Sequence, residues 1–211
     1  GIVANQKNVQ RSRKGEMQMG GVIYSDASDK AARFIMNCNQ DRIPLLFIHD
    51  VNGFMVGKES EWGGIAKDGA KLVNAVSNSV VPKITLVVGG SYGAGNYALS
   101  GRAYKPRFMY AWPSAKIAVM GGEQAAKTLT QIKLSKMGNV DDAVKNKIYN
   151  EIKNKIDLQS DPRYAAARMW IDEIIDPIET RNVISRSLKI INYQTKMPAP
   201  NFGVLQVWIK L

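Results

Sequence analysis

The 211-residue sequence contains a single cysteine, Cys38, and a single histidine, His49. One cysteine cannot form an internal disulfide or a cysteine metal cluster, so we expect a reducing compartment and no metal site. Long hydrophobic runs are also lacking. The longest, including Pro44–Ile48 and Ile84–Val88, are too short to cross a bilayer. The chain also opens without a basic and apolar leader, so neither a membrane nor secretion is predicted.

Acidic residues are scarce relative to basic ones, 18 against 29, which gives a formal net charge of +11. Most lysines, such as Lys145 and Lys153, alternate with Asn, Asp and Glu, as on solvated helix faces. The one dense basic cluster, Arg11–Lys14, lacks the interleaved aromatic residues of a nucleic-acid stacking surface. No nucleic-acid partner is therefore predicted. An anionic small ligand that carries phosphates is compatible with this charge.

The hydrophobic pattern alternates between buried strands and amphipathic helices, which predicts an α/β fold with mostly parallel strands. Strands are expected at Gly1–Ala4, Pro44–His49, Lys83–Val88, Phe108–Trp112 and Ile117–Met120. Six helices are expected. The first starts at Asp26 and has the apolar face Ala31, Phe34, Ile35 and Cys38, and the second has the apolar stripe Ile65, Leu72, Val73, Val76 and Val80. The others run from about Gly95 to Gly101, from Gly121, over Asp141–Ile156 and over Val183–Ile191. Residues 7–21 and 50–61 are expected to be loops.

The turn after the third main strand matches two enzyme motifs. Gly93–Ala98 fits the dinucleotide-binding pattern G-x-G-x-x-G/A. That fold also needs an acidic residue about twenty positions later to hold the ribose, and none occurs between Gly93 and Gly122. Gly89–Gly93 fits the G-x-S-x-G nucleophile elbow around Ser91, whose histidine should follow the serine. Because His49 precedes Ser91, we expect a hydrogen-bonded core histidine rather than a hydrolase triad.

A third interpretation of the same turn needs no catalytic side chain. The backbone amides of Ala94 and Gly95, at the start of a helix, could point together and form an oxyanion hole. Small residues there would let a ligand approach the backbone closely. From spacing alone, a turn that merely requires glycine is an equally good explanation.

The residues themselves resemble a known family. Several segments resemble, in the same order along the chain, the carboxyltransferase β subunits of biotin-dependent acyl-CoA carboxylases. They are Asn52–Gly57, Gly64–Ala70, Gly93–Tyr97 and Trp112-Pro113 with Ala118–Gly122. Tyr164–Arg168 with Ile175–Pro177 resembles the closing segment of the same family. Gly-Phe-Met-Val-Gly and Gly-Ala-Gly-Asn-Tyr are most similar to the methylcrotonoyl-CoA carboxylase type.

This resemblance implies a crotonase/Clp-protease-like spiral of ββα units with added C-terminal helices. It identifies residues 1–211 as the C-terminal, biotin-binding carboxyltransferase domain, with 139–211 as a helical extension within it. The first strands and the whole acyl-CoA-binding N-domain of the family would lie outside this sequence. A cytoplasmic (bacterial) or mitochondrial matrix location is expected.

The resemblance also implies a mechanism. Carboxybiotin arrives on a biotin carboxyl carrier protein, and a biotin enolate is stabilised by the amides that match Ala94 and Gly95. Carboxyl transfer then produces a carboxylated acyl-CoA, of the methylcrotonoyl-, propionyl- or acetyl-CoA kind. The implied biotin-binding residues are Gly53, Phe54, Gly93, Gly121 and Gly122, and the implied acyl-CoA-binding residues are Asn96 and Tyr97. Arg11–Lys14 is a candidate contact for CoA phosphates, with a solvated loop as the alternative.

The expected partners are the biotin carboxylase subunit, the carrier protein, the N-domain and an acyl-CoA, in a homo-oligomer that is a hexamer in the family. Two other functions remain open. One is a biotin-dependent acyl-CoA decarboxylase subunit of the glutaconyl-CoA type. The other is a catalytically silent assembly domain. A crotonase-type hydratase or isomerase would need acidic residues near the oxyanion turn, and the neighbouring sequence has none.

Overall fold

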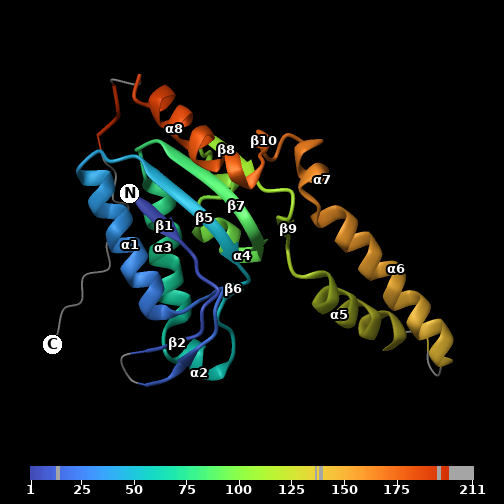
Figure 1. Cartoon of the computed structure of the whole chain (residues 1–211). Helices are drawn as coiled ribbons and strands as arrows, with labels where there is room; N and C mark the ends of the chain where they lie inside the picture. Colours follow the sequence, from blue (N-terminus) through green and yellow to red (C-terminus); the bar gives the residue numbers. More distant parts are fainter. Residues whose placement is uncertain (13–14, 136, 138–139, 194–195, 200–211) are drawn as a thin grey trace.

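A parallel β-sheet forms the centre of the computed structural model, which describes residues 1–12, 15–135, 137, 140–193 and 196–199 (Figure 1). Its strands lie in the order β1-β5-β7-β8-β10, and β9 pairs with the far end of β7. The bounds are β1 Ile2–Ala4, β5 Leu45–Val51, β7 Lys83–Tyr92, β8 Phe108–Ala111, β9 Lys116–Ala118 and β10 Glu173–Ile174. Every pair in this sheet is parallel, as the sequence predicted.

Continuous apolar runs place β5 and β7 in the middle of the sheet, since a strand covered on both faces needs apolar side chains on both. Leu45, Phe47 and Val51 of β5 pack on one face with helices α1 (Ser25–Gln40) and α3 (Ile65–Asn78). Ile84 and Leu86 of β7 pack on the other face with α8 (Thr180–Ile191). Figure 1 shows α1 and α3 side by side, with α8 across the sheet from them.

Helices α5 (Gly122–Ser135) and α6 (Asp142–Ser160) pack against each other and project away from the sheet (Figure 1). β9 precedes α5 in the chain, and α7 (Pro162–Ala166) follows α6 and leads back to the sheet. The remaining elements are short: β2 Gln10–Arg11, β3 Met17–Gln18, β4 Val22–Ile23, β6 Gly53–Phe54, α2 Lys58–Trp62, α4 Gly93–Ala98, η1 Arg102–Tyr104 and η2 Pro177–Glu179. The hairpin β2–β3 is antiparallel, and β4 pairs with β6 in parallel.

Several predicted boundaries and faces were wrong. The buried stripe of α1 contains Ala32, Ile35 and Cys38, whereas Phe34 is 40% exposed beside the start of β1. The predicted loops 7–21 and 50–61 contain short strands and α2. β7 continues through the glycines to Tyr92, and α4 ends at Ala98, before the predicted end at Gly101.

Parts of some predictions fall on residues outside those the structure describes, namely Arg13, Lys14, residue 139 and residues 200–211. Among the described residues, no helix combines the length and the apolar character that a membrane span requires.

Candidate active site

The site begins at the carboxyl end of β7, where the strand register is irregular. Between His49 and Val51 of β5 the pairing with β7 shifts, so that Val51 lies opposite Ser91. The Asp50 carboxylate fills the irregularity and accepts a hydrogen bond from the Gly90 amide at 2.9 Å. A Cβ at Gly89 would overlap that carboxylate, so a larger residue there would have to displace the Asp50 side chain.

Gly93 turns the chain from β7 into α4. Its φ of +50° lies in the left-handed region that glycine adopts without steric cost. A Cβ at Gly93 would also approach the Val119 carbonyl oxygen to 2.8 Å. Both the backbone conformation and the contact with the chain after β9 therefore require glycine here.

Ala94 and Gly95 form the first turn of α4, as the oxyanion hypothesis requires. The first amides of a helix have no acceptor in a preceding helical turn and remain free to donate to a ligand. Ala94 is exposed, whereas Gly95 is buried. A Cβ on Gly95 would lie 2.7 Å from a Val51 methyl carbon and 3.3 Å from Cα of Gly53. The start of α4 is thus packed closely against the loop that contains β6.

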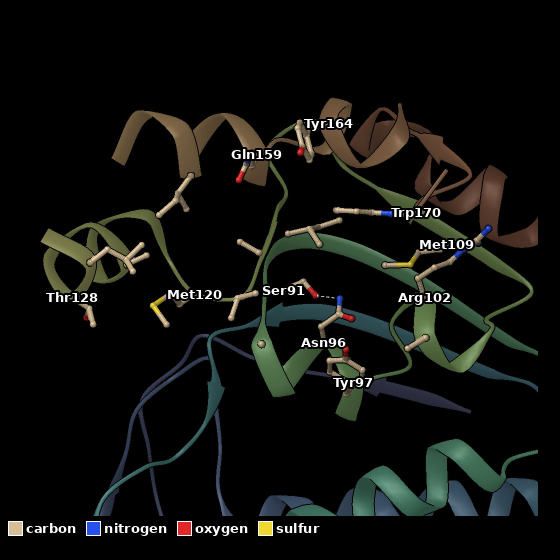
Figure 2. Close-up of a pocket in the computed structure, with 18 residues that line it drawn as sticks. Ser91, Asn96, Tyr97, Arg102, Met109, Met120, Thr128, Gln159, Tyr164 and Trp170 are labelled. Atoms are coloured by element: carbon tan, nitrogen blue, oxygen red, sulfur yellow. Dashed lines mark hydrogen bonds between the residues drawn. The ribbon is translucent and has the colours of Figure 1, made fainter. Parts of the chain in front are cut away.

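A cavity of about 710 Å³ opens beside α4 (Figure 2). Its walls come from the end of β7, α4, β9, α5, α6 and α7, and its apolar residues include Tyr97, Met109 and Trp170. The lining residues are Ser91, Gly93, Asn96, Tyr97, Arg102, Ala103, Met109, Ile117, Ala118, Val119, Met120, Ala125, Thr128, Leu129, Ile156, Gln159, Tyr164 and Trp170. This set contains no carboxylate and no histidine, so the cavity wall offers no side chain of the kinds most used as general bases.

The structure places Ser91 and His49 in contact, with Nδ1 of the imidazole 2.8 Å from the serine Oγ. This pair does not have the arrangement of a hydrolase. Both residues have no exposed surface, and the other ring nitrogen lies 2.6 Å from the Leu99 carbonyl oxygen instead of a carboxylate. Burial lowers the pKa of His49 to about 4, so its imidazole is neutral at pH 7. The predicted hydrogen-bonded core histidine is confirmed.

The predicted ligand residues fall into separate places. Gly93, Asn96 and Tyr97 line the cavity, and Tyr97 is 50% exposed. Gly53 adjoins Gly95 on the other side of the turn. These placements bring the predicted acyl-CoA and oxyanion residues together along one short helix.

Phe54, Gly121 and Gly122 lie apart from the cavity wall. The Phe54 ring packs over Gly69 of α3, next to the hydrophobic core. Gly121 has open space where a side chain would be, whereas a Cβ at Gly122 would meet the Asp157 carboxylate of α6. The two glycines therefore mark the junction between β9 and α5 and leave one of its faces open.

Sequence reasoning missed the wall of the cavity that faces α4. Ile156, Tyr164 and Trp170 come from α6, α7 and the segment after it. The ring centroids of Tyr164 and Trp170 lie 6.1 Å apart in an edge-to-face contact. The four-residue spacing of apolar positions along α6 was a usable signal, because Ile156 belongs to that stripe. Nothing local in the sequence indicated that α6 folds back toward α4.

No group of three or more His, Cys, Asp or Glu residues in the described part of the chain could hold a metal ion. Among the residues that line the cavity, Arg102 carries the positive charge. The Arg102 guanidinium lies 3.4 Å from an oxygen of Asp172, whose other oxygen accepts from the Met109 amide at 2.7 Å.

Residues 1–205 match the family model described as the carboxyl transferase domain. The chain belongs to the carboxyl transferase domain family. It is 46% identical over 198 residues to the mitochondrial methylcrotonoyl-CoA carboxylase beta chain of Dictyostelium discoideum, covering 92% of this chain and 34% of that protein. It is 47% identical over 180 residues to a biotin-dependent 3-methylcrotonyl-coenzyme A carboxylase beta1 subunit of Mycobacterium tuberculosis, covering 83% and 34%.

Solved structures agree with this family membership. The geranyl-CoA carboxylase beta subunit of P. aeruginosa superposes with a TM-score of 0.76 at 42% identity, over 90% of this chain and 36% of that chain. A transcarboxylase 12S structure superposes with a TM-score of 0.77 at 38% identity, over 96% of this chain and 37% of that chain. The predicted crotonase-type α/β fold is therefore confirmed. The chain spans about a third of the length of the curated relatives it matches.

Proposed function

We propose that this chain is the biotin-facing part of a biotin-dependent acyl-CoA carboxyltransferase, which moves a carboxyl group from carboxybiotin to a short or branched acyl-CoA. The observation that carries the proposal is the match of residues 1–205 to the carboxyl transferase domain. The names of the relatives favour a methylcrotonoyl-CoA-like substrate. Carboxybiotin, delivered by a carrier protein, would supply the activated carboxyl group.

The turn at the start of α4 fits this chemistry. Biotin, when bound, would present its ureido oxygen as a site of developing negative charge, and preorganised N–H donors stabilise such charge in a transition state. The amides of Ala94 and Gly95 would donate to that oxygen. Gly53 supports the fit, because no atom of the residues that the structure describes lies within 4 Å of the point where its Cβ would be. A flat ureido ring could therefore approach this backbone closely.

The cavity supports the second half of the proposal. Its wall is predominantly apolar and includes Tyr97, Met109 and Trp170, which suits the acyl end of a thioester. Because the wall carries neither a carboxylate nor a histidine, proton removal from the acyl group would be left to the bound biotin. The chain would then orient the substrate, exclude water and stabilise charge through its amides.

The partners and location follow the relatives. We propose a homo-oligomer that acts with a biotin carboxylase subunit, a biotin carboxyl carrier protein and an N-terminal acyl-CoA-binding domain. The transcarboxylase relative is described as a hexamer assembly, and the Dictyostelium relative as mitochondrial. A bacterial cytoplasm or a mitochondrial matrix would supply these partners.

The experiment uses a full-length chimera in which the aligned part of this chain, 83% of its length, replaces the matching segment of the Mycobacterium tuberculosis beta1 subunit. Transfer of labelled carboxyl from carboxybiotin to methylcrotonoyl-, propionyl- and acetyl-CoA is measured. We expect transfer, and we expect Ala94→Pro, which lacks one amide proton, to lower kcat about 100-fold. Ala94→Ser retains that proton and should lose much less.

Two results would contradict the proposal. Release of CO2 from carboxylated acyl-CoA without measurable transfer in the other direction would indicate a decarboxylase. A folded, assembled chimera that acts on none of the three thioesters would indicate an assembly domain. Equal losses in Ala94→Pro and Ala94→Ser would contradict the role of the amide.

A further inference from the structure

We propose that His49, Ser91 and Asn96 form a positioning relay that holds the amides of Ala94 and Gly95 in place for catalysis. This inference rests on the proposed function. None of the three side chains needs to contact the reacting atoms. They would act through the turn that they connect, so we regard them as positioning residues rather than catalytic ones.

The hydrogen-bond roles in the relay follow from the chemistry of its ends. The Leu99 carbonyl oxygen can only accept, so the His49 Nε2 atom, 2.6 Å away, must carry a proton. In a neutral imidazole Nδ1 is then an acceptor, and it accepts a hydrogen bond from the Ser91 hydroxyl at 2.8 Å. The Ser91 oxygen in turn accepts from Nδ2 of Asn96, also at 2.8 Å (Figure 2). Each of the three hydrogen bonds therefore joins one donor to one acceptor.

This arrangement encloses the proposed amide donors. Ser91 and Asn96 stand on either side of residues 92–95, so their hydrogen bond closes the turn that presents Ala94 and Gly95. His49 fixes the direction of the serine hydroxyl from β5, the neighbouring strand. Through Leu99, the residue after α4, the same imidazole also holds the other end of this helix.

Packing holds the Asn96 end of the relay. A Cβ at Gly101 would overlap Oδ1 of Asn96, so the absence of a side chain there leaves room for the amide group. The Gly101 amide also donates to the Asn96 backbone oxygen at 2.7 Å. The Asn96 side chain is thus fixed at its oxygen by close packing and at its nitrogen by Ser91.

A neighbouring hydrogen bond provides a matched control. Thr85 of β7 donates from Oγ1 to the Ser100 carbonyl oxygen at 2.7 Å, and both residues are fully buried. Thr85→Val and Ser91→Ala each remove one buried hydroxyl that joins β7 to the region of α4. Only Ser91 belongs to the relay. A merely structural role for Ser91 predicts equal effects, whereas the relay predicts different ones.

The first test is nuclear magnetic resonance on the 211-residue chain, in which His49 gives the only histidine signal. We expect a neutral imidazole protonated at Nε2, and we expect the chemical shift of Nδ1 to show that this nitrogen accepts a hydrogen bond. In Ser91→Ala, the order parameters of the Ala94 and Gly95 amides should fall from about 0.85 toward 0.6. In Thr85→Val they should stay at the wild-type value.

The second test measures turnover in the chimera described above. Ser91→Ala should lower kcat at least about tenfold while KM changes less than about twofold. The reason is that displaced donors reduce the stabilisation of the transition state more than the binding of the substrate. His49→Leu, which removes both imidazole contacts, should show the same separation of kcat from KM. His49→Gln offers one donor and one acceptor and should recover a substantial part of kcat.

The outcomes separate this inference from the proposed function. Equal amide order parameters in Ser91→Ala and Thr85→Val would overturn the relay, as would a His49 ring protonated at Nδ1. A wild-type chimera without transfer would refute the proposed function, and the amide measurements on the chain alone would still decide the relay. If His49→Leu does not fold, the comparison of Ser91→Ala with Thr85→Val stands by itself.

Discussion

Replacing Gly93 by alanine perturbs the candidate site at the residue that starts α4. Two effects add there. The φ of +50° costs an L-residue about 1 kcal/mol. The new Cβ would also lie 2.8 Å from the Val119 carbonyl oxygen, and that oxygen is backbone and cannot rotate away. Overpacking of this kind costs about 1–3 kcal/mol.

The expected net loss in the free energy of unfolding is about 1.5–3.5 kcal/mol, because alanine also lowers the entropy of the unfolded chain by the equivalent of about 0.5 kcal/mol. Relief of the contact would move the turn by a substantial part of an ångström. Since a misplacement near 1 Å can cost about 100-fold in rate, we expect kcat to fall by about that factor with little change in KM.

The matched control is Gly15→Ala in the hairpin between β2 and β3. Gly15 has φ +84°, but among the described residues no atom lies within 4 Å of its prospective Cβ. The Gly15→Ala variant should lose only about 0.5–1 kcal/mol of unfolding free energy, measured by urea denaturation of the chain. It should leave carboxyl transfer in the chimera unchanged. Equal losses of stability in the two variants, or a wild-type kcat in Gly93→Ala, would contradict this role of Gly93.

Two further predictions concern stability. The folded-state pKa of His49, about 4, lies below its ordinary value of 6.5, so the unfolded chain takes up the proton first as the pH falls. Relative to His49→Gln, the wild-type chain should therefore lose about 3 kcal/mol of unfolding free energy between pH 6.5 and 4, measured by urea denaturation; parallel pH profiles would contradict this. Asn39 is 2% exposed, and its Oδ1 accepts from the amides of Val80 and Val81 at 3.0 and 3.3 Å. Asn39→Leu, which leaves both donors unpaired, should cost about 2–4 kcal/mol in urea unfolding, and a loss below about 0.5 kcal/mol would show that water or a shift in the backbone satisfies them.

The sequence alone was sufficient for the central strands and for the class of the fold. β5 and β7 each contain a mostly apolar run, Leu45–Ile48 and Ile84–Val88, because helices cover both faces there, and such runs can be recognised without a structure. The turn from β7 into α4 was also predictable in outline, since a cluster of small residues after a buried strand is typical of a tight turn. Local pattern could not decide whether these glycines serve a ligand or only the turn.

Tertiary structure decided which side of each helix is buried and how far β7 extends. On α1, Phe34 and Ile35 belong to the same apolar arc, and only the position of the sheet selects Ile35 for the core. Glycine disfavours a strand interior, yet β7 continues through Gly90 because β9 pairs with it and Asp50 accepts its amide proton. Both outcomes depend on partners distant in sequence.

The contents of the site show the same division. Tyr97, Asn96 and the amides of Ala94 and Gly95 lie in one short segment, so the sequence could indicate them together. Trp170 and Ile156 reach the cavity only because α6 and α7 fold back toward α4. His49 and Ser91, 42 positions apart, meet because parallel pairing places their two strands next to each other. Sequence pattern records what each segment can bury, and the packing of segments decides which side chains meet.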